Sequence, residues 1–427
     1  MSNRIYHQQP IEDDDRHSIS SSASLTLTES VPLLPGKHLD HTTLQQEFHW
    51  IFYNSLPIIG TYLLQSSFQF ASIFTLGHLI KLLSVYIYKE LISYWLYCLF
   101  LRYLLPGAPA YIAFEATKRY LQAQGIMHAS TYSMMVTAPL NFVLNYAFVY
   151  TFGMGFIGAP LATSFSYWIM FLLLIAYAKF VKGSEGWGGW SRECLKDWVP
   201  FLKLAFSGII IICAEWTAFE VSSLAASYLG TTDLAAQSIL LTLSSATYTI
   251  PMGISIAATN RVGNAIGGNY GYKAKVASTT ALLFSVLFGI INSLFFLLTR
   301  SKLGLLFSSD QKVIDMVSNV LPIFAIFQVT DGIASVGGGV IRGLGRQNVA
   351  AWINLVAYYL IALPFGFYLT FKLNWALTGL WTGLTIALFL VAFGEVVFLL
   401  NIDWFQEVKR AQLRVKVEKD KVTENLV

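Results

Sequence analysis

The residues best suited to chemistry in this sequence are two carboxylates inside an apolar segment. Glu215 and Glu220 belong to "CAEWTAFEVSS" (213–223), and apolar residues continue on both sides of it. Placing an ionisable side chain in hydrocarbon costs about 2.5–3.5 kcal/mol on insertion scales, so such a residue points to a function. A carboxyl group in a low-dielectric cavity can take up and release protons near neutral pH. We therefore predict that Glu215 and Glu220 bind protons or a cation.

The spacing of the two acids determines how one helix presents them. Five residues separate Glu215 from Glu220, which places them about 140° apart around a helix. They do not share one narrow face, but a helix that lines a wide cavity could expose both. Trp216 and Phe219 stand between them and offer aromatic surface for a flat organic cation. The alternative is that both acids are buried and hydrogen-bonded for packing alone.

Three further acids lie in apolar segments. Asp331 stands in the glycine-rich "FQVTDGIASVGGGVIRG", where small residues allow close helix approach, and we predict that it joins the cation or proton site. Gln328, one turn earlier, either hydrogen-bonds a substrate or bridges helices. A local ion pair with Lys118 explains Glu115. Glu395 lies near the inner end of the last apolar segment, where water could reach it.

A proline-containing segment follows the two acids. "YTIPMGISIAATNRVGNAIGGN" (248–269) places Pro251 in the middle of an apolar run, where its missing N–H predicts a helix bend. Tyr248, three residues earlier, is expected to line a substrate cleft together with Trp216, Phe219 and Gln328. Arg261, near the end of the segment, is interpreted as a structural anchor rather than a substrate ligand.

The elements that position these residues must be membrane helices. Hydrophobic residues make up 55% of the 427-residue chain and charged residues only 12%, whereas soluble domains carry about twice that charge. The predicted fold class is an all-α polytopic membrane protein with two pseudo-symmetric helical bundles. Apolar runs long enough to cross about 30 Å of hydrocarbon are expected at 50–77, 91–117, 129–151, 156–179, 199–229, 233–258, 275–298, 312–340, 348–371 and 375–400.

Composition divides the chain into five parts. We expect a disordered cytoplasmic tail over 1–48, an N-terminal lobe over 49–181, a cytoplasmic linker over 182–198, a C-terminal six-helix lobe over 199–401 and a cytoplasmic tail over 402–427. Lys and Arg concentrate in the loops that this arrangement places inside, which fits the positive-inside rule. The basic residues assigned to inner loops include Lys118, Arg261 and Arg342.

Other kinds of chemistry have no pattern in this sequence. We find no P-loop for ATP, no H-E-x-x-H and no G-x-S-x-G. Three cysteines form neither a disulfide framework nor a set with metal-ligand spacing. We therefore expect no enzyme, no cofactor, no metal site and no nucleic-acid partner, and an ion gradient as the energy source.

The two halves of the sequence resemble each other, with a gap. Gly158 and Gly379 occupy matching positions 221 residues apart, whereas the opening apolar segments, 56–79 and 206–229, are only 150 residues apart. The difference of about 71 residues predicts that the first half lacks two helices that the second half carries between 230 and 300. Same-orientation repeats are typical of transporters with a site between the halves.

Four blocks carry the most specific patterns: "FEATKRYLQAQGIMHASTY" (114–132), "AEWTAFEV" (214–221), "GTTDLAAQSILLTLSSATYTIPMGISIAATNRVGNAIG" (230–267) and "GGGVIRGLGRQ" (337–347). They resemble blocks of the MATE (multidrug and toxic compound extrusion) family, in its fungal branch, and they occur in the family's order. The resemblance implies two six-helix lobes around a central cleft. It also implies export of organic cations or metabolites in exchange for protons or sodium.

The resemblance also implies roles for particular residues. Glu215 and Trp216 match a Glu-Trp pattern in the family's seventh helix, Glu220 matches its second acid, and Asp331 matches a polar or acidic position in the tenth helix. The sequence departs from the family at its second and third helices, which are absent. This agrees with the gap in the repeat, and it predicts about ten spans where the family has about twelve.

The functional prediction is a secondary active transporter that exports or sequesters organic cations, xenobiotics or metabolites by proton or sodium antiport. Two alternatives remain open: an inactive, truncated family member that acts at most as a membrane interaction protein, and a lipid-type flippase. A flippase would need a cavity lined by Arg and Lys, and few basic residues lie within the apolar segments. We expect a monomer in the lipid bilayer, in the vacuolar membrane in preference to the plasma membrane.

Overall fold

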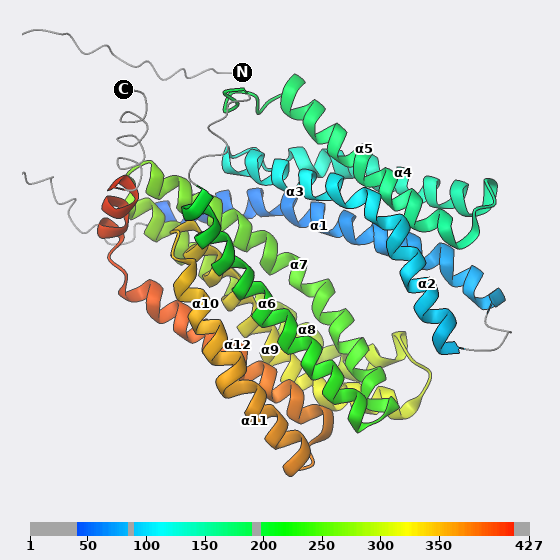
Figure 1. Cartoon of the computed structure of the whole chain (residues 1–427). Coiled ribbons are helices and arrows are strands. Elements are labelled where there is room, and N and C mark those ends of the chain that lie inside the picture. The colour runs from blue at the N-terminus through cyan, green and yellow to red at the C-terminus, as the bar shows by residue number, and fades with distance from the viewer. Residues whose placement is uncertain (1–40, 84–88, 190–197, 414–427) are drawn as a thin grey trace, which may run out of the picture. The chain divides into compact units, whose positions relative to one another are not determined.

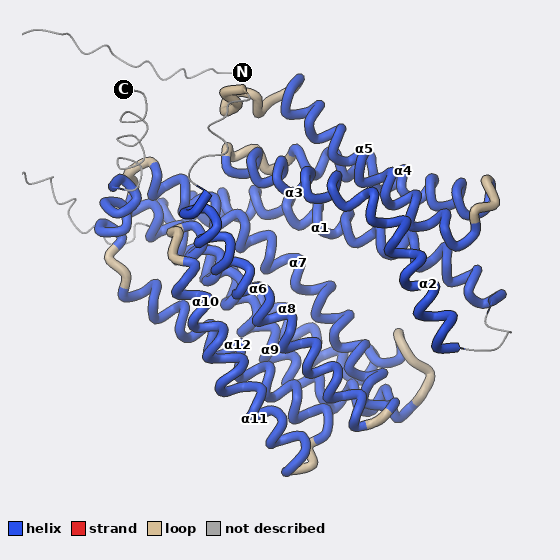
Figure 2. The backbone as a smooth tube through the Cα atoms, viewed as in Figure 1, coloured by secondary structure: helices blue, strands red, loops and turns tan. Residues whose placement is uncertain are grey.

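The structure is a computed structural model, and it describes residues 41–83, 89–189 and 198–413. These residues are almost entirely helical and include no strand, as Figure 2 shows. The first half contains α1 (His41–Leu83), α2 (Lys89–Leu104), α3 (Ala108–Ala123), α4 (Ala129–Tyr146) and α5 (Gly158–Phe180). The second half contains α6 (Trp198–Leu229), α7 (Thr231–Gly267), α8 (Gly271–Leu303), α9 (Gln311–Gly343), α10 (Gln347–Leu355), α11 (Leu363–Phe367) and α12 (Ala376–Asn401), labelled in Figure 1.

Seven helical segments of the described chain are long and apolar enough to cross a membrane. They confirm the seven predicted spans from 156–179 to 375–400. The segment Gln347–Lys372 unites α10, α11 and the π-helical turns beside them into one span, so the second half contributes six. The chain is therefore an integral membrane protein.

The other three predicted spans lie in helices outside this set of seven. α1 contains the predicted span 50–77 but begins at His41, within the stretch expected to be a disordered tail. α4 and the π-helical turn that follows it end at Thr151, which matches the prediction of 129–151. The expected tail over 1–40, part of the linker (190–197) and the end of the chain (414–427) lie outside the described residues.

The predicted span 91–117 is wrong, because the chain breaks within it. α2 ends at Leu104 and α3 begins at Ala108, with the 3₁₀ turn Leu105–Gly107 between them. The proline in this turn has no N–H for a helical hydrogen bond. Gly107 packs directly on α5, since a Cβ atom there would lie 2.7 Å from the Cα of Ser164. A tight contact between helices thus accompanies the break.

α9 occupies the centre of the second half, where it packs against α7, α8 and α12 (Figure 1). Small residues allow α7 to come close: a Cβ atom on Gly343 would lie 2.7 Å from the carbonyl oxygen of Thr259. The Thr259 hydroxyl donates a hydrogen bond to the Gly339 carbonyl at 2.7 Å. This packing fixes α9, and with it Asp331, at the middle of the bundle.

The first half has its own core, and α1 connects it to the second half. Buried apolar side chains from α1, α3, α4 and α5 form one cluster that includes Phe68, Phe114 and Met170. α1 packs against α4 and also against α7 and α8. Ile51, near the start of α1, belongs to the buried cluster of the second half.

The internal repeat is visible in the backbone itself. π-helical turns occur at Ala147–Thr151 and again at Tyr368–Lys372, an offset of 221 residues. Gly158 and Gly379 pack against these turns, since a Cβ atom on either would lie 2.7 Å from turn backbone. The offset between the π-helical turns equals the offset that the sequence repeat predicts. α7 and all but the last residues of α8 lie within the stretch, 230–300, for which the repeat leaves no counterpart in the first half.

The turns after the π-helical segments also repeat, in a backbone region that favours glycine. Gly153 (φ +67°) corresponds to Asn374 (φ +55°) at the same offset. Gly155 (φ +57°) corresponds to Ala376 (φ +47°). Alanine therefore occupies a left-handed conformation in which its repeat partner is glycine.

Replacing Ala376 by Gly should stabilise the protein. The left-handed conformation costs an L-residue roughly 1–2 kcal/mol, and glycine loses only about 0.5–1 kcal/mol through its greater unfolded-state freedom. We expect the melting temperature in detergent to rise by about 1–2 °C. Ala387→Gly is the control. Ala387 is buried in the regular helix α12, so its replacement by glycine should lower the melting temperature of the protein. Equal decreases of the melting temperature in both variants would contradict the expected backbone strain at Ala376.

Candidate functional site

Three of the predicted site residues line one internal cavity of the second half. Glu215 comes from α6, Tyr248 from α7 and Asp331 from α9, and all three border a space of about 40 Å³. A water molecule needs roughly 10–15 Å³ of such space. The cavity therefore has room for a few waters and not for an organic cation.

Asp331 is the most deeply placed of these acids. Asp331 is 4% exposed and lies about two thirds of the way along α9, the helix that α7, α8 and α12 pack against. Glu215 is half-buried on α6 and faces the same cavity. Two carboxyl groups from different helices thus share one enclosed environment with other polar side chains, where hydrogen bonds and proton exchange offset the cost of burial.

Two charged residues of the cavity differ from their predicted positions. Arg342 was assigned to an inner loop, but it belongs to α9 and lines the cavity, where Nη2 donates to the Ser255 hydroxyl at 3.0 Å. Glu395 was expected within reach of water, but it is 1% exposed and borders the same cavity. The cavity thus contains three carboxyl groups and one guanidinium group.

The glycine run at 337–339 makes room for the Glu395 carboxylate. A Cβ atom on Gly337 would lie 2.6 Å from Glu395 Oε2, and one on Gly338 would lie 3.1 Å from Oε1. Oε2 has no hydrogen-bond partner among the described residues. From the sequence alone, these glycines indicate only close packing between helices. The sequence signal for this pairing is an acid, Glu395, in one span and a run of glycines, which have no side chains, in another.

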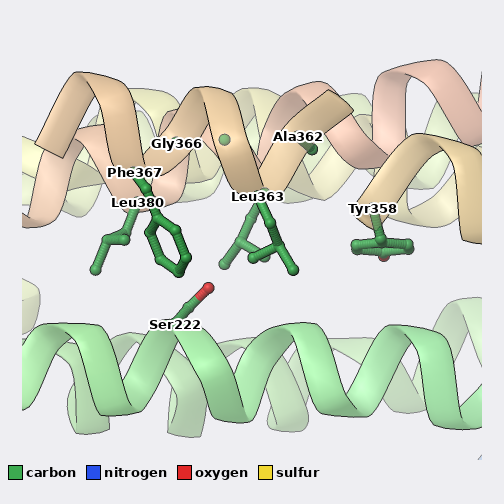
Figure 3. A pocket seen from close by; sticks show the side chains of 9 residues that line it. Ser222, Tyr358, Ala362, Leu363, Gly366, Phe367 and Leu380 are labelled. Atoms are coloured by element: carbon green, nitrogen blue, oxygen red, sulfur yellow. The ribbon is translucent and has the colours of Figure 1, made fainter. Parts of the chain in front are cut away.

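Tyr358 separates the cavity from an apolar crevice. The crevice lies between α6 and the segment that contains α11, and it is too narrow for water (Figure 3). Its lining residues are Ser222, Tyr358, Ala362, Leu363, Gly366, Phe367, Leu380, Gly383 and Leu384. The Tyr358 side chain is buried, and its hydroxyl has no hydrogen-bond partner among the described residues. The neighbouring Tyr359 donates to the Ala214 carbonyl at 3.2 Å, which ties this segment to α6.

Gln328 and Phe219 lie in the packed interior beside the cavity and not in its lining. Asn292 Nδ2 donates to Gln328 Oε1 at 2.7 Å, so Gln328 connects α8 with α9. Phe219 meets Phe327 edge to face, with ring centroids 6.0 Å apart. Of the two roles considered for Gln328, the structure favours bridging between helices. Phe219 belongs to an aromatic cluster with Phe327 and Trp381.

Glu220 and Trp216 lie outside the cavity, on the exposed side of α6. Trp216 is 61% exposed and Glu220 is exposed. Four residues separate them, so they are neighbours on one helix face. Pro251 is buried within α7, which continues as helix from Thr231 to Gly267 around it. The predicted site is thus divided between an enclosed cavity and an exposed surface.

The acid of the first half has the partner that its spacing suggested. Lys118 Nζ lies 2.5 Å from Glu115 Oε1. Lys118 itself differs from its predicted inner-loop position, because it is 1% exposed within α3 and lies over the Tyr62 ring at 4.5 Å from the centroid. Gln65 Nε2 also contacts Glu115, at 3.5 Å. The local ion pair is confirmed.

Comparison with known proteins adds a family and a fold. The sequence profile of the MatE family matches residues 81–147 and 209–368. An uncharacterized transporter of Schizosaccharomyces pombe is 40% identical over 314 residues, which are 73% of this chain and 58% of that protein. The multidrug and toxin extrusion protein 1 of Homo sapiens is 35% identical over 319 residues, 74% of this chain and 56% of that protein.

Solved structures agree with this comparison. The eukaryotic MATE transporter AtDTX14 superposes with a TM-score of 0.71 at 26% identity, covering 87% of this chain and 84% of that one. The Vibrio cholerae MATE transporter VcmN in its bent form gives a TM-score of 0.64 at 15% identity, covering 87% and 99%, and shows likeness of fold alone. The chain spans less than three fifths of the length of the two relatives named above. It covers 48% of an uncharacterized transporter of Saccharomyces cerevisiae.

Proposed function

Because this chain belongs to the MATE family, whose members are transporters and not enzymes, we propose that it exports or sequesters organic cations, xenobiotics or metabolites in exchange for protons or sodium. The observation that carries the proposal is the internal cavity in which Glu215, Asp331 and Glu395 face one guanidinium group. Its excess of acidic groups favours proton or cation exchange. We also propose the division into an N-terminal lobe (49–181) and a C-terminal lobe (199–401).

The division of the site supports separate places for the proton and the substrate. The cavity admits only a few waters, so Glu215 and Asp331 exchange protons there. Trp216 and Glu220 lie on the exposed side of α6, where an aromatic face and a carboxylate can meet an organic cation. Proton uptake by Glu215 removes a negative charge from α6, which weakens the attraction for a cation on the same helix.

Proteoliposomes test this proposal directly. The full chain is reconstituted, the lumen is made acidic relative to the outside, and uptake of ethidium is followed by fluorescence. Uptake should require the protein and stop when a protonophore removes the pH gradient. A sodium gradient at equal pH forms the second arm and distinguishes the coupling ion. Folded protein that shows no uptake with either gradient would refute the proposal.

The cavity also bears on the two alternatives. A lipid-type flippase would need a basic cavity for phosphate groups, and this one holds a single Arg among three carboxyl groups. An inactive member would give stable protein without gradient-coupled uptake in the same proteoliposomes. We propose a monomer in the vacuolar membrane, in preference to the plasma membrane; fractionation of cells that express the tagged chain tests the location.

A further inference from the structure

A second cavity, of about 450 Å³, lies where α6 and α10 begin and the helical residues 404–413 follow α12. Its charged side chains are Arg346 and Arg410, and its apolar ones include Leu204, Val349 and Leu413. Neither arginine takes part in the proposed transport site. A polar end and an apolar wall in one space suit an amphipathic ligand.

A buried carboxylate fixes the two arginines. Glu407 is 2% exposed and accepts hydrogen bonds from Arg346 Nε at 3.1 Å, Arg346 Nη2 at 2.7 Å and Arg410 Nη1 at 2.5 Å. Two guanidinium groups share one carboxylate, so the cluster of Arg346, Arg410 and Glu407 keeps one excess positive charge. Both retain N–H donors for a further anion, because a guanidinium group carries five.

The segment that carries Glu407 is held against the bundle. Trp404 and Val408 are buried in the core cluster of the second half. A Cβ atom on Gly271 would lie 3.2 Å from the Trp404 carbonyl oxygen, so this segment contacts the start of α8 closely. The arginine pair is therefore a feature of the folded bundle and not of a loose tail.

An apolar groove of about 560 Å³ adjoins this cavity and shares Asn348 with it. Asn348 accepts a hydrogen bond from Ser207 of α6. The groove contains one base, Lys203, and the exposed apolar side chains Val199, Leu202, Phe206 and Ile209. Arg346 directly precedes α10, whose first backbone N–H groups favour an anion.

We propose that the cavity lined by Arg346 and Arg410, together with the adjoining groove, binds an anionic phospholipid. Arg346 and Arg410 hold the phosphate group, and the groove along α6 receives an acyl chain. Basic pockets between membrane helices on the cytoplasmic side are suited to anionic headgroups. The positive-inside pattern of the sequence places this end of the helices on that side. The apolar groove selects a lipid rather than free phosphate.

Native mass spectrometry of the full chain in neutral detergent tests the proposal. Palmitoyl-oleoyl phosphatidylserine should bind more tightly than phosphatidylcholine with the same acyl chains. Arg410→Gln should weaken phosphatidylserine binding about fivefold, the effect of one basic residue at an anionic surface, while Arg346 remains to pair with Glu407. Arg300→Gln is the matched control, because Arg300 lies at the opposite end of α8 from Gly271 and is exposed.

A further variant separates charge from structure. Glu407→Gln removes the negative charge but can still accept hydrogen bonds, so phosphatidylserine should bind at least as tightly as in the parent. The melting temperature of every variant is measured to verify folding. Equal binding of the two lipids, equal effects of Arg410→Gln and Arg300→Gln, weaker binding by folded Glu407→Gln, or displacement of the lipid by millimolar inorganic phosphate would each overturn the proposal.

Discussion

A Glu215→Gln variant is expected to lose proton-driven ethidium uptake, to below about one hundredth of the parent rate, the scale that one proton-transferring group contributes. Glutamine keeps the shape of the side chain but cannot exchange a proton. Glu215 lines the small cavity with Asp331, and few other groups there can replace it. The measurement is the initial rate of uptake into proteoliposomes with an acidic lumen, normalised to reconstituted protein. Asp331→Asn should give the same loss.

Glu220→Gln is the matched control, since it makes the same chemical change five residues away on the same helix. Glu220 is exposed and does not line the cavity. From sequence alone, both variants are expected to abolish uptake. The geometry predicts instead that Glu220→Gln raises the KM for the cation and preserves the dependence on the pH gradient. Parent-like transport by both Glu215→Gln and Asp331→Asn would refute the proton site.

Arg261→Gln is expected to reduce stability by about 3 kcal/mol, the lower end of the cost of breaking a buried ion pair. Arg261 donates to Glu47 through Nε at 2.8 Å and Nη2 at 2.6 Å, and its guanidinium group lies over the Trp50 ring at 4.4 Å. The Glu47 side chain is only 5% exposed. Without Arg261, a buried carboxylate of α1 has lost its charged partner on α7. Thermal unfolding in detergent measures the loss.

Two controls test the origin of this effect. Glu47→Gln together with Arg261→Gln removes both charges and should recover much of the stability that Arg261→Gln loses, because no charge remains buried. Lys312→Gln removes an exposed base from the start of α9 and should change stability by less than about 0.5 kcal/mol. If Arg261→Gln alone is as stable as the parent, the pair of Arg261 and Glu47 contributes nothing to stability.

The sequence predicts most of the helical framework because long apolar runs have few alternatives in a bilayer. All seven spans from 156–179 onward are confirmed. Arg261 was interpreted as an anchor, and it has that role with Glu47. The break in 91–117 does not appear in the hydropathy of the run, although Pro106-Gly107 is a turn signal in the sequence, and the contact of Gly107 with Ser164 requires close packing there. Hydropathy does not report such a packing requirement.

The candidate site was only partly predictable, because helix rotation is set by packing between helices. Glu215, Tyr248 and Asp331 meet in one cavity as expected. Glu220 faces outward, since the packed side of α6 includes Ala214, Ala218 and Ser222. Glu395 and Arg342 enter the cavity from helices whose rotation the sequence left open. The weak periodicity of segments that are apolar all round explains this gap.

The repeated backbone irregularities make the two halves an internal comparison. The π-helical turns at Ala147–Thr151 and Tyr368–Lys372 have the same length and the same offset as the glycines that pack on them. A substitution in one of these turns thus has a counterpart 221 residues away, with similar local geometry but different neighbours. Measuring both members of such a pair separates the part of a mutational effect that belongs to the local turn from the part that belongs to its surroundings.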